Sequence, residues 1–247
     1  MTELNFEEPF LEQGEAEIPS TLPVLPLKET VIFPQSVSPL AIGQERSVRL
    51  VDDVLEGERM LALVTVKNSE VEEPGWDDLY ETGTAAVVHK MIRVPDGTLR
   101  ILVQGVGRIR LERHLQDEPY LVGEFEVVPD EIEETPELEA LTRSVQTEFG
   151  RLISLVPYLP SELELAAANV DDPSALSHLV ASTLRLKTEE KQSLLEQRDV
   201  SARLRDVLRI LKRELEVVEL GTKIQSQVQS ELEKGQREYF LRQQLKA

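Results

Sequence analysis

The spacing of apolar residues changes once along this chain, and that change limits the fold. From residue 21 to about residue 128, short alternating and β-branched runs are separated by turn residues, which is typical of strands. Beyond residue 136 the apolar residues recur every three or four positions, as in amphipathic helices. Because the two patterns are segregated, the sequence predicts an α+β protein with a β lobe, a helical lobe and a long projecting helix.

The positions of glycine and proline refine the prediction for the β lobe. The Pro95-Asp96-Gly97 sequence lies between two strand-like runs and predicts a hairpin, since Pro fixes φ and Gly accepts a positive φ. Gly105 and Gly107 predict a bulge or sharp bend, which sheets use when they curl toward a barrel. Strands are expected at 21–27, 37–42, 60–66, 83–94, 99–106, 108–115 and 120–128, and a helix at 45–55 with Val48, Val51, Val54 and Leu55 on one face.

An acidic stretch with two prolines, residues 129–136, separates the two patterns and is expected to be a linker. Asp172 and Pro173 form a helix-start signal, because Asp can cap exposed amides and Pro is preorganised for the first turn. Helices are expected at about 136–156, 161–168, 173–186, 188–196 and 200–247. The predicted organisation is an acidic flexible extension (1–20), a β lobe (21–128), the linker (129–136), a helical lobe (137–199) and a long helix (200–247).

The long helix carries an apolar stripe that changes along its length. Its first half is expected to pack on the preceding helices, and its second half to project or to pair with another subunit. Residues 229–247 contain no helix stop signal, so the helix is expected to continue into a larger protein. The stripe consists of Leu204, Leu208, Leu211, Leu215 and Val218, and then of Leu220, Ile224, Val228 and Leu232.

The extension at residues 1–20 has two readings. It is acidic and contains Pro9, Gly14 and Pro19, so a solvated tail is the plain interpretation. The alternative is that Phe10 and Leu11 dock on the domain's own apolar surface as a mock ligand.

The net charge of the chain limits the kinds of partner that it is expected to bind. The chain has a formal net charge of −19, and the 10 basic and 7 acidic residues from Ser201 onward leave −22 for residues 1–200. Such a body repels a phosphate backbone, so nucleic acid is an unexpected partner. The chain has no cysteine, which fits a reducing compartment or selection against heat-labile residues, and it has no apolar run long enough to span a membrane. We therefore expect a cytoplasmic protein.

Motifs for catalysis and cofactors are not found in the sequence. None of the 12 glycines precedes a lysine, which excludes a P-loop, and there is no Gly-x-Ser-x-Gly elbow. The histidines His89, His114 and His178 lack metal-ligand spacing. The paired carboxylates are expected to lie on solvent-exposed faces and not to act as general acids or bases. No catalytic, cofactor or metal site is expected within these residues, and binding through apolar surface is the remaining chemistry. Trp76, in an acidic stretch, is expected to be a structural anchor rather than a ligand contact.

Several ordered motifs resemble the N-terminal region of bacterial Lon ATP-dependent proteases. Together they cover nearly everything after residue 20, while the acidic extension departs from the family pattern. The motifs are 22–34 (LPVLPLKETVIFP), Pro39-Leu40, Ile42-Gly43, 95–97 (PDG) with 100–105 (RILVQG), Asp172-Pro173, 190–196 (EKQSLLE), Arg203-Leu204 and 236–247 (QREYFLRQQLKA).

The resemblance implies a PUA-like β pseudo-barrel lobe, a helical bundle lobe and a long helix leading into an AAA+ module that binds ATP and Mg. A Ser-Lys protease domain would follow, and the whole would form a homo-hexamer. The ATPase lysine and the Ser-Lys dyad have no matching positions in this chain. In the family this region is held to recognise unfolded, damaged or degron-tagged proteins and present them to the ATPase ring. The alternatives are a non-catalytic assembly or spacer domain, or a small-ligand regulatory domain.

For substrate recognition we expect an apolar patch, because unfolded chains expose side chains that folded proteins bury. A flexible Met would help the patch to accept varied sequences. A shallow apolar groove would favour substrate capture, and a deep polar pocket would favour a small ligand. The predicted patch residues are Leu25, Leu27, Ile32, Phe33, Val37 and Met91.

Overall fold

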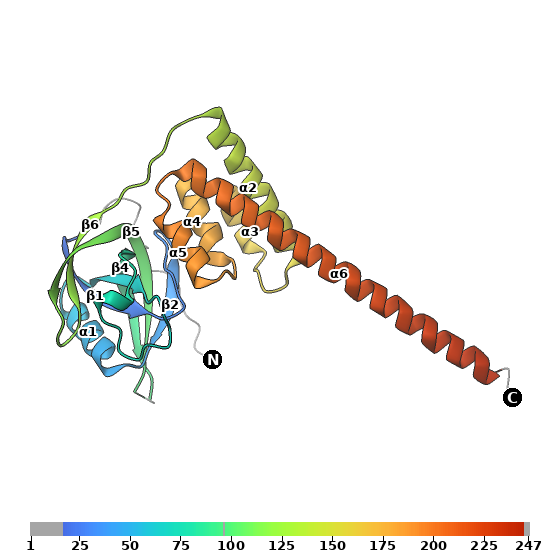
Figure 1. Ribbon diagram of the computed structural model, residues 1–247, viewed down its shortest axis with the longest axis horizontal. Helices are drawn as coiled ribbons and strands as arrows, with labels where there is room; N and C mark the ends of the chain where they lie inside the picture. The colour runs from blue at the N-terminus through green and yellow to red at the C-terminus, as the bar shows by residue number, and fades with distance from the viewer. Residues whose placement is uncertain (1–16, 96, 245–247) are drawn as a thin grey trace. The chain divides into compact units, whose positions relative to one another are not determined.

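The computed structural model describes residues 17–95 and 97–244, with side chains described up to residue 237. The contacts divide the chain into two compact units. The β-rich unit contains the described residues up to Glu131 together with Ala181–Arg198. The helical unit contains Ile132–Val180 and the residues from Asp199 onward. The predicted α+β class is confirmed, with a six-stranded sheet and helices (Figure 1).

The strands of the β-rich unit close on themselves. Their order is β2-β5-β4-β3-β1-β6, and β6 also pairs with β5, so that five strands form a ring and β2 extends it at β5. β1 pairs with β3 in parallel, and the other pairings are antiparallel. The strands are β1 (Thr21–Leu27), β2 (Val37–Ile42), β3 (Met60–Thr65), β4 (Thr82–Arg93), β5 (Leu99–Gln116) and β6 (Val122–Val127).

The predicted bulge lies inside a single long strand. Ala85 pairs with Gly107 and Ala86 pairs with Gly105, so one extra residue of β5 bulges between the two glycines. The expected strands 99–106 and 108–115 are therefore one strand, because a bulge bends a strand while keeping its pairing on both sides. A Cβ atom at Gly105 would collide with the carbonyl oxygen of Phe33. Glycine at this position lets the segment before β2 pass directly against β5.

The predicted hairpin between β4 and β5 is also confirmed. The Val94 N–H donates to the Thr98 oxygen at 2.9 Å, and Gly97 has a φ of 87°, which suits glycine. After β2 comes α1 (Glu45–Glu56), close to the expected 45–55. It buries Leu50, Val51 and Val54, whereas Val48 and Leu55 are only partly buried.

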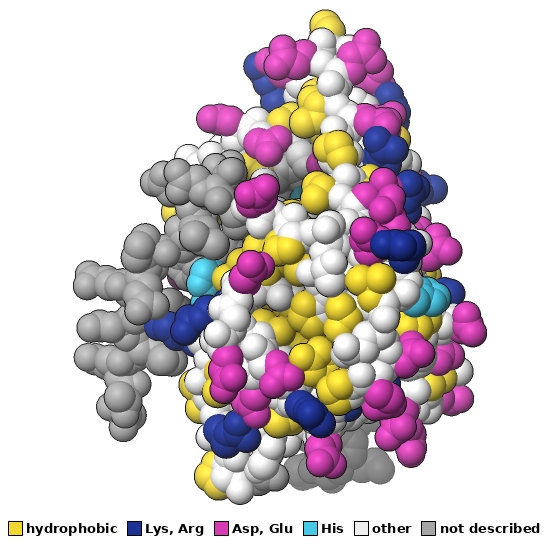
Figure 2. Space-filling view, turned by 90° about the vertical axis from the view of Figure 1, so that its left-hand side faces the viewer, with side chains coloured by type: hydrophobic (Ala, Val, Ile, Leu, Met, Phe, Trp, Pro, Cys, Tyr) yellow, Lys and Arg dark blue, Asp and Glu magenta, His cyan; other side chains and the backbone are white. Residues whose placement is uncertain are grey.

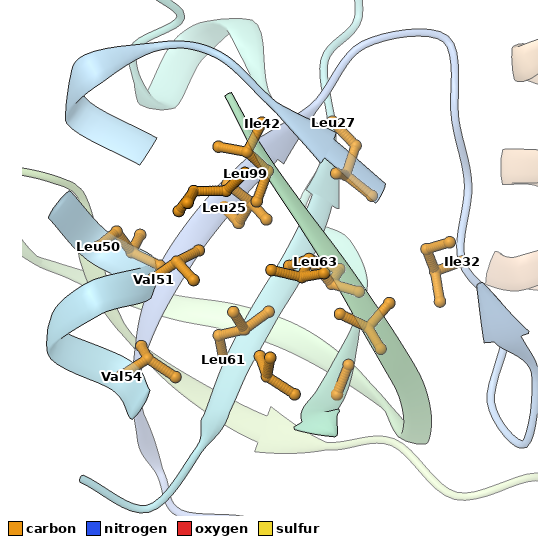
Figure 3. Packing of buried hydrophobic residues seen from close by; sticks show 14 residues of the cluster. Leu25, Leu27, Ile32, Ile42, Leu50, Val51, Val54, Leu61, Leu63 and Leu99 are labelled. Carbon is orange, nitrogen blue, oxygen red and sulfur yellow. The ribbon is translucent and has the colours of Figure 1, made fainter. Parts of the chain in front are cut away.

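Two hydrophobic clusters lie on opposite faces of the central strands. Leu25 and Leu27 of β1 enter the first cluster, and Leu22 and Val24 enter the second. The side chains of β3 alternate between the two clusters in the same way. Leu61 and Leu63 lie in the first cluster, and Met60, Ala62 and Val64 lie in the second. In the first cluster, α1 packs Leu50, Val51 and Val54 against the strands (Figure 3). Both faces of β1 and β3 are thus buried, which explains their continuous apolar sequence.

The helix α5 (Thr188–Glu196) belongs to the β-rich unit. Its Gln192 side chain is buried, and Nε2 donates to the Thr82 oxygen at 3.0 Å. Arg108 of β5, also buried, donates from Nε to the Leu195 oxygen at 2.5 Å and from a terminal nitrogen to Asp130 at 2.6 Å. These polar contacts join residues far apart in sequence, and the structure therefore groups 181–198 with the strands, whereas the sequence predicted a helical lobe over 137–199.

The helical unit follows the expected order of elements. Thr135 caps α2, its hydroxyl accepting the Leu138 N–H at 3.1 Å. The buried Arg203 side chain donates to Ser177 at 2.7 Å and to Ser174 at 2.9 Å, which joins α6 to α4. The helices are α2 (Pro136–Leu155), α3 (Glu162–Ala168), α4 (Pro173–Thr183), whose last residues group with the β-rich unit, and α6 (Val200–Gln244). Over residues 17–95 and 97–244, no helix has the length and apolar content needed to cross a membrane.

Candidate functional site

The structure divides the predicted patch between core and surface. Phe33 is 0% exposed, and Leu25, Leu27 and Ile32 are also buried. Val37 is 41% exposed, and Met91 is half-buried against the first cluster. A core segment and a binding surface have the same hydrophobicity, so composition did not separate them. Of the six predicted residues, Val37 and part of Met91 can present apolar surface, while Leu25 and Leu27 line a cavity beside α1, and binding at any of them stays a prediction.

A larger apolar surface surrounds Val37. In β2, the side chains of Leu40 and Ile42 pack on the first cluster, so those of Val37, Pro39 and Ala41 point to the opposite face and are exposed. On the same face the register places Pro39 beside Leu102 of β5, and Ala41 beside Arg100, which in turn pairs with Ile92 of β4. Ile92 is 60% exposed. We call this surface the outer strip, made of Val37, Pro39, Ala41, Ile92 and Leu102.

The backbone at the edge of β2 is a poor template for an added strand. The Gly105 N–H of β5 donates to the Ser36 oxygen at 2.9 Å. In an antiparallel pair, every second residue of a strand directs its backbone N–H and C=O toward the partner strand, so the residues of β2 alternate from Ser36 onward. The backbone polar groups of Val37, Pro39 and Ala41 therefore face away from β5. Since Pro39 has no N–H, this edge has a gap in its donors. A ligand of the outer strip would be held mainly by side-chain contacts.

Two basic side chains border the outer strip. Lys90 pairs with Leu102 and Arg100 pairs with Ala41, and both side chains are exposed. Neither forms an ion pair with the described part of the chain. The total charge of the chain is −19, so the outer strip combines apolar surface with a local positive charge that is opposite in sign to the net charge of the chain. A segment that carries apolar and acidic residues would match it.

The hairpin that carries Ile92 is tied to α1. Arg93 donates to both carboxylate oxygens of Asp52, at 2.9 and 3.1 Å. His89 and Gln104 also bond across β4 and β5 at 2.7 Å. An exposed ion pair adds little stability, but its two-point geometry limits rotation of the hairpin end. The outer strip is thus built on paired strands with fixed register.

Two neighbouring cavities lie beside α1, on the β-rich unit. Their volumes are about 340 and 470 Å³, and both are lined by Pro26, Lys28, Gln44, Ser47 and Pro74. The larger cavity is also lined by Pro39 and Ala41, so it adjoins the outer strip. Tyr120 lines the smaller one and donates to Asp53 at 2.8 Å; burial raises the pKa of Tyr120, and this bond raises it further. The walls mix charged and apolar groups, which suits a small ligand as well as an apolar side chain. Figure 2 shows a face on which hydrophobic side chains gather between acidic ones.

Trp76 is held by the surrounding structure. Its ring stacks on His114 with centroids 4.4 Å apart and planes 5° from parallel, and its Nε1–H donates to Asp117 at 2.7 Å. Trp76 also packs against the second cluster. These contacts fit the expected structural anchor. Within the described residues, no group of three His, Cys, Asp or Glu side chains is placed to hold a metal ion.

The long helix α6 carries a second exposed apolar surface. Leu204, Leu211 and Leu215 are buried in the helical unit, as expected for the first half of the stripe. Beyond them the stripe is open to solvent, with Leu220 at 56% and Leu232 at 58% exposed. We call this surface the helix stripe, and it consists of Val217, Leu220, Ile224, Val228 and Leu232. Its exposure within this chain fits the prediction that the second half projects or pairs with another subunit, and does not choose between the two.

Comparison with protein families gives one match over most of the chain. Residues 21–213 match the model of the "ATP-dependent protease La (LON) substrate-binding domain". The match covers the whole β-rich unit from β1 onward and the helical unit as far as residue 213 of α6. It begins after the acidic extension.

Comparison with individual proteins agrees. The chain is 44% identical over 231 residues to "Lon protease" of Dictyoglomus thermophilum, covering 94% of this chain and 29% of that protein. It is 43% identical over 235 residues to "Lon protease 1" of Herpetosiphon aurantiacus, covering 93% and 29%. The chain therefore spans under a third of the length of these relatives. A solved structure, the "N terminal domain of Mycobacterium avium complex Lon protease", matches with a TM-score of 0.66 at 24% identity, covering 78% of this chain and 98% of that chain, and supports the fold.

Proposed function

The chain belongs to the family of Lon substrate-binding domains, and from this membership we propose that it binds exposed hydrophobic segments of unfolded, damaged or degron-tagged proteins. It would present them to the ATPase ring of an ATP-dependent serine protease of protein quality control. ATP, Mg and the Ser-Lys dyad would belong to modules outside these residues, and the full-length protein would be a homo-hexamer. The observation that carries the proposal is the exposed, firmly paired outer strip.

The outer strip is suited to weak and unselective binding. Fully burying one large aliphatic side chain contributes about 1.5–3 kcal/mol, and partial burial contributes less. A few such contacts give a weak complex, and a folded protein offers fewer of them because it buries most of its large apolar side chains. Several tethered copies in one assembly would raise the overall affinity by about 10²-fold or more. Low affinity for each site is therefore compatible with effective capture.

The test is an NMR titration of the chain with one protein in two states, native and permanently unfolded. We expect shifts with the unfolded form alone, at Val37, Ile92 and Leu102. A double variant, Val37→Ser with Ile92→Ser, should weaken these shifts. The matched control is Val127→Ser on β6, since Val127 is an exposed strand residue, at 51%, away from the outer strip. Equal shifts with both states, or none with either, would contradict substrate capture.

The helix stripe supports a second role, in assembly or spacing. Five exposed apolar residues at helical spacing are unusual for a helix that stays in solvent. In the full-length protein this stripe would pair with another subunit and keep the binding units apart from the ATPase ring. Ile224→Ser with Val228→Ser in the full-length protein should lower the assembly state seen by sedimentation. The control is Leu165→Ser, an exposed residue of α3, and an unchanged assembly would contradict this role.

A small-ligand regulatory role stays a prediction. The two cavities beside α1 supply the space that such a ligand needs. In the same NMR experiment, a ligand in the cavities would shift Gln44 and Ser47, which line both. An unfolded protein on the outer strip would instead shift Val37, Ile92 and Leu102, which line neither cavity.

A further inference from the structure

We propose that residues 1–16 of this chain occupy the outer strip as an internal competitor of the substrate. The inference rests on the proposed function, because it assigns a regulator to the same surface. In the absence of substrate, Phe6, Phe10 and Leu11 lie against the apolar residues of the outer strip. Binding of an unfolded protein then requires displacement of this segment.

The chemistry of the segment complements that of the outer strip. Residues 1–16 contain five glutamates and neither lysine nor arginine, and the aromatic residues Phe6 and Phe10 are interspersed among the glutamates. The outer strip has exposed apolar side chains with Lys90 and Arg100 between them. Exposed ion pairs contribute little affinity, so burial of the aromatic rings supplies most of the binding and the charges set its orientation.

The first described residues lie close enough to the outer strip for residues 1–16 to reach it. Ile18 lies against Gly107 of β5, since a Cβ built on that glycine would be 2.9 Å from Ile18 Cδ1. The backbone is also fixed nearby, where the Phe125 N–H donates to the Ser20 oxygen at 2.7 Å. Leu102 is five residues before Gly107 on the same strand, about 17 Å away at the usual strand rise.

The length of the segment covers this distance. Leu11 is seven residues before Ile18, and an extended chain of that length spans about 23 Å. Phe10 and Leu11 therefore reach the middle of the outer strip, and Phe6 reaches beyond it. Because the segment is tethered, its effective concentration is in the millimolar range, and even a weak contact is substantially occupied.

A second copy of the same surface is a poorer occupant. A two-fold contact between two outer strips would bring Lys90 and Arg100 of one copy toward the same side chains of the other. Like charges at an interface are unfavourable. The acidic segment removes this conflict, which is why we assign the outer strip to residues 1–16.

The first experiment places a spin label on the segment. The chain has no cysteine, so Gln13→Cys gives a single labelling site and keeps Phe6, Phe10 and Leu11 in place. In the labelled chain we expect line broadening at the amides of Val37, Ile92 and Leu102. Lys90→Glu with Arg100→Glu should reduce that broadening, whereas the control Lys223→Glu on α6 should not. Broadening confined to the cavities beside α1, or no broadening on the β-rich unit, would overturn the proposal.

The second experiment separates a contact within one chain from a contact between chains. A spin-labelled chain without ¹⁵N is mixed with a ¹⁵N-labelled chain that carries no spin label. Broadening in this mixture equal to that in the singly labelled sample would assign the outer strip to a second copy and overturn the proposal. Its absence is the expected result.

The third experiment distinguishes this inference from the proposed function. Removing residues 1–16 should strengthen binding of an unfolded protein by about 2- to 10-fold, which follows from a millimolar internal competitor of millimolar affinity. Phe10→Ser with Leu11→Ser should do the same. Unchanged affinity would overturn the internal competitor while leaving substrate capture intact. Broadening by the label without binding of unfolded protein to either chain would overturn substrate capture while leaving the docked segment intact.

Discussion

Arg108, in the middle of β5, donates a hydrogen bond to the carbonyl oxygen of Leu195, which lies 87 positions later in the chain at the end of α5. The same guanidinium donates to Asp130, just past the end of β6. One buried cation therefore fixes two segments that follow the strands in sequence. These bonds lie within the β-rich unit, to which 181–198 also belongs.

Replacing Arg108 with Met should destabilise the protein by about 2–4 kcal/mol, because Asp130 and the carbonyl groups of Leu195, Val128 and Gln197 would lose a hydrogen-bond donor. Urea denaturation followed by circular dichroism measures this loss. The matched control is Arg110→Met, on the same strand but in an exposed ion pair with Glu126, and it should cost less than about 1 kcal/mol. Equal losses in the two variants would contradict the structural role of Arg108.

Gly105→Ala should be more damaging than a typical glycine substitution. The added Cβ would meet the backbone carbonyl of Phe33, which cannot rotate away, and we expect a loss of about 2 kcal/mol or more. Gly235→Ala provides the contrast, since nothing lies within 4 Å of its added Cβ in α6. That change should be neutral or stabilise the helix by up to about 1 kcal/mol. Thermal unfolding of both variants would decide the matter, and a harmless Gly105→Ala would refute the close approach.

Phe33→Ala tests whether the buried members of the predicted patch act in the core. Phe33 is 0% exposed, so its removal leaves a cavity and should cost about 3–5 kcal/mol of stability. Chemical denaturation gives the free energy of unfolding. If the variant kept its stability but lost binding to unfolded protein, Phe33 would belong to a binding surface and not to the core.

Ile92→Ser should weaken binding of an unfolded protein while leaving stability almost unchanged. Ile92 is already 60% exposed, so little burial is lost on mutation. A partly buried contact of about 1 kcal/mol in the complex corresponds to about 5-fold weaker binding. Fluorescence anisotropy with a labelled unfolded protein measures the change. Val127→Ser should bind like the parent chain, and a similar loss there would remove the outer strip as the specific site.

Lys191→Met tests the cost of burying a cation on α5. Burial lowers the pKa of Lys191 below its usual 10.5, so the folded state holds its proton less tightly than the unfolded state. Stability of the parent chain should therefore rise as the pH increases from the lowered pKa to about 10.5. Lys191→Met should be more stable than the parent at pH 7, with a difference that shrinks as the pH approaches 10.5. A difference independent of pH would contradict this origin.

The sequence by itself determined the kind and order of the elements. The hairpin at 95–97, the bulge between Gly105 and Gly107 and the helix start at Pro173 depend on backbone preferences of a few adjacent residues, and such preferences are readable without neighbours in space. The helix stripe was likewise visible, because periodicity along one helix is a local property. The family resemblance has the same origin, since it rests on ordered motifs along the chain.

Only the tertiary structure decided which apolar residues are exposed. Phe33 and Val37 are four positions apart and both apolar, yet Phe33 is fully buried and Val37 is exposed. The outer strip depends on pairing among β2, β4 and β5, and the place of α5 depends on Arg108 reaching Leu195. Burial and pairing are set by residues distant in sequence, and one residue of register reverses the face of a strand.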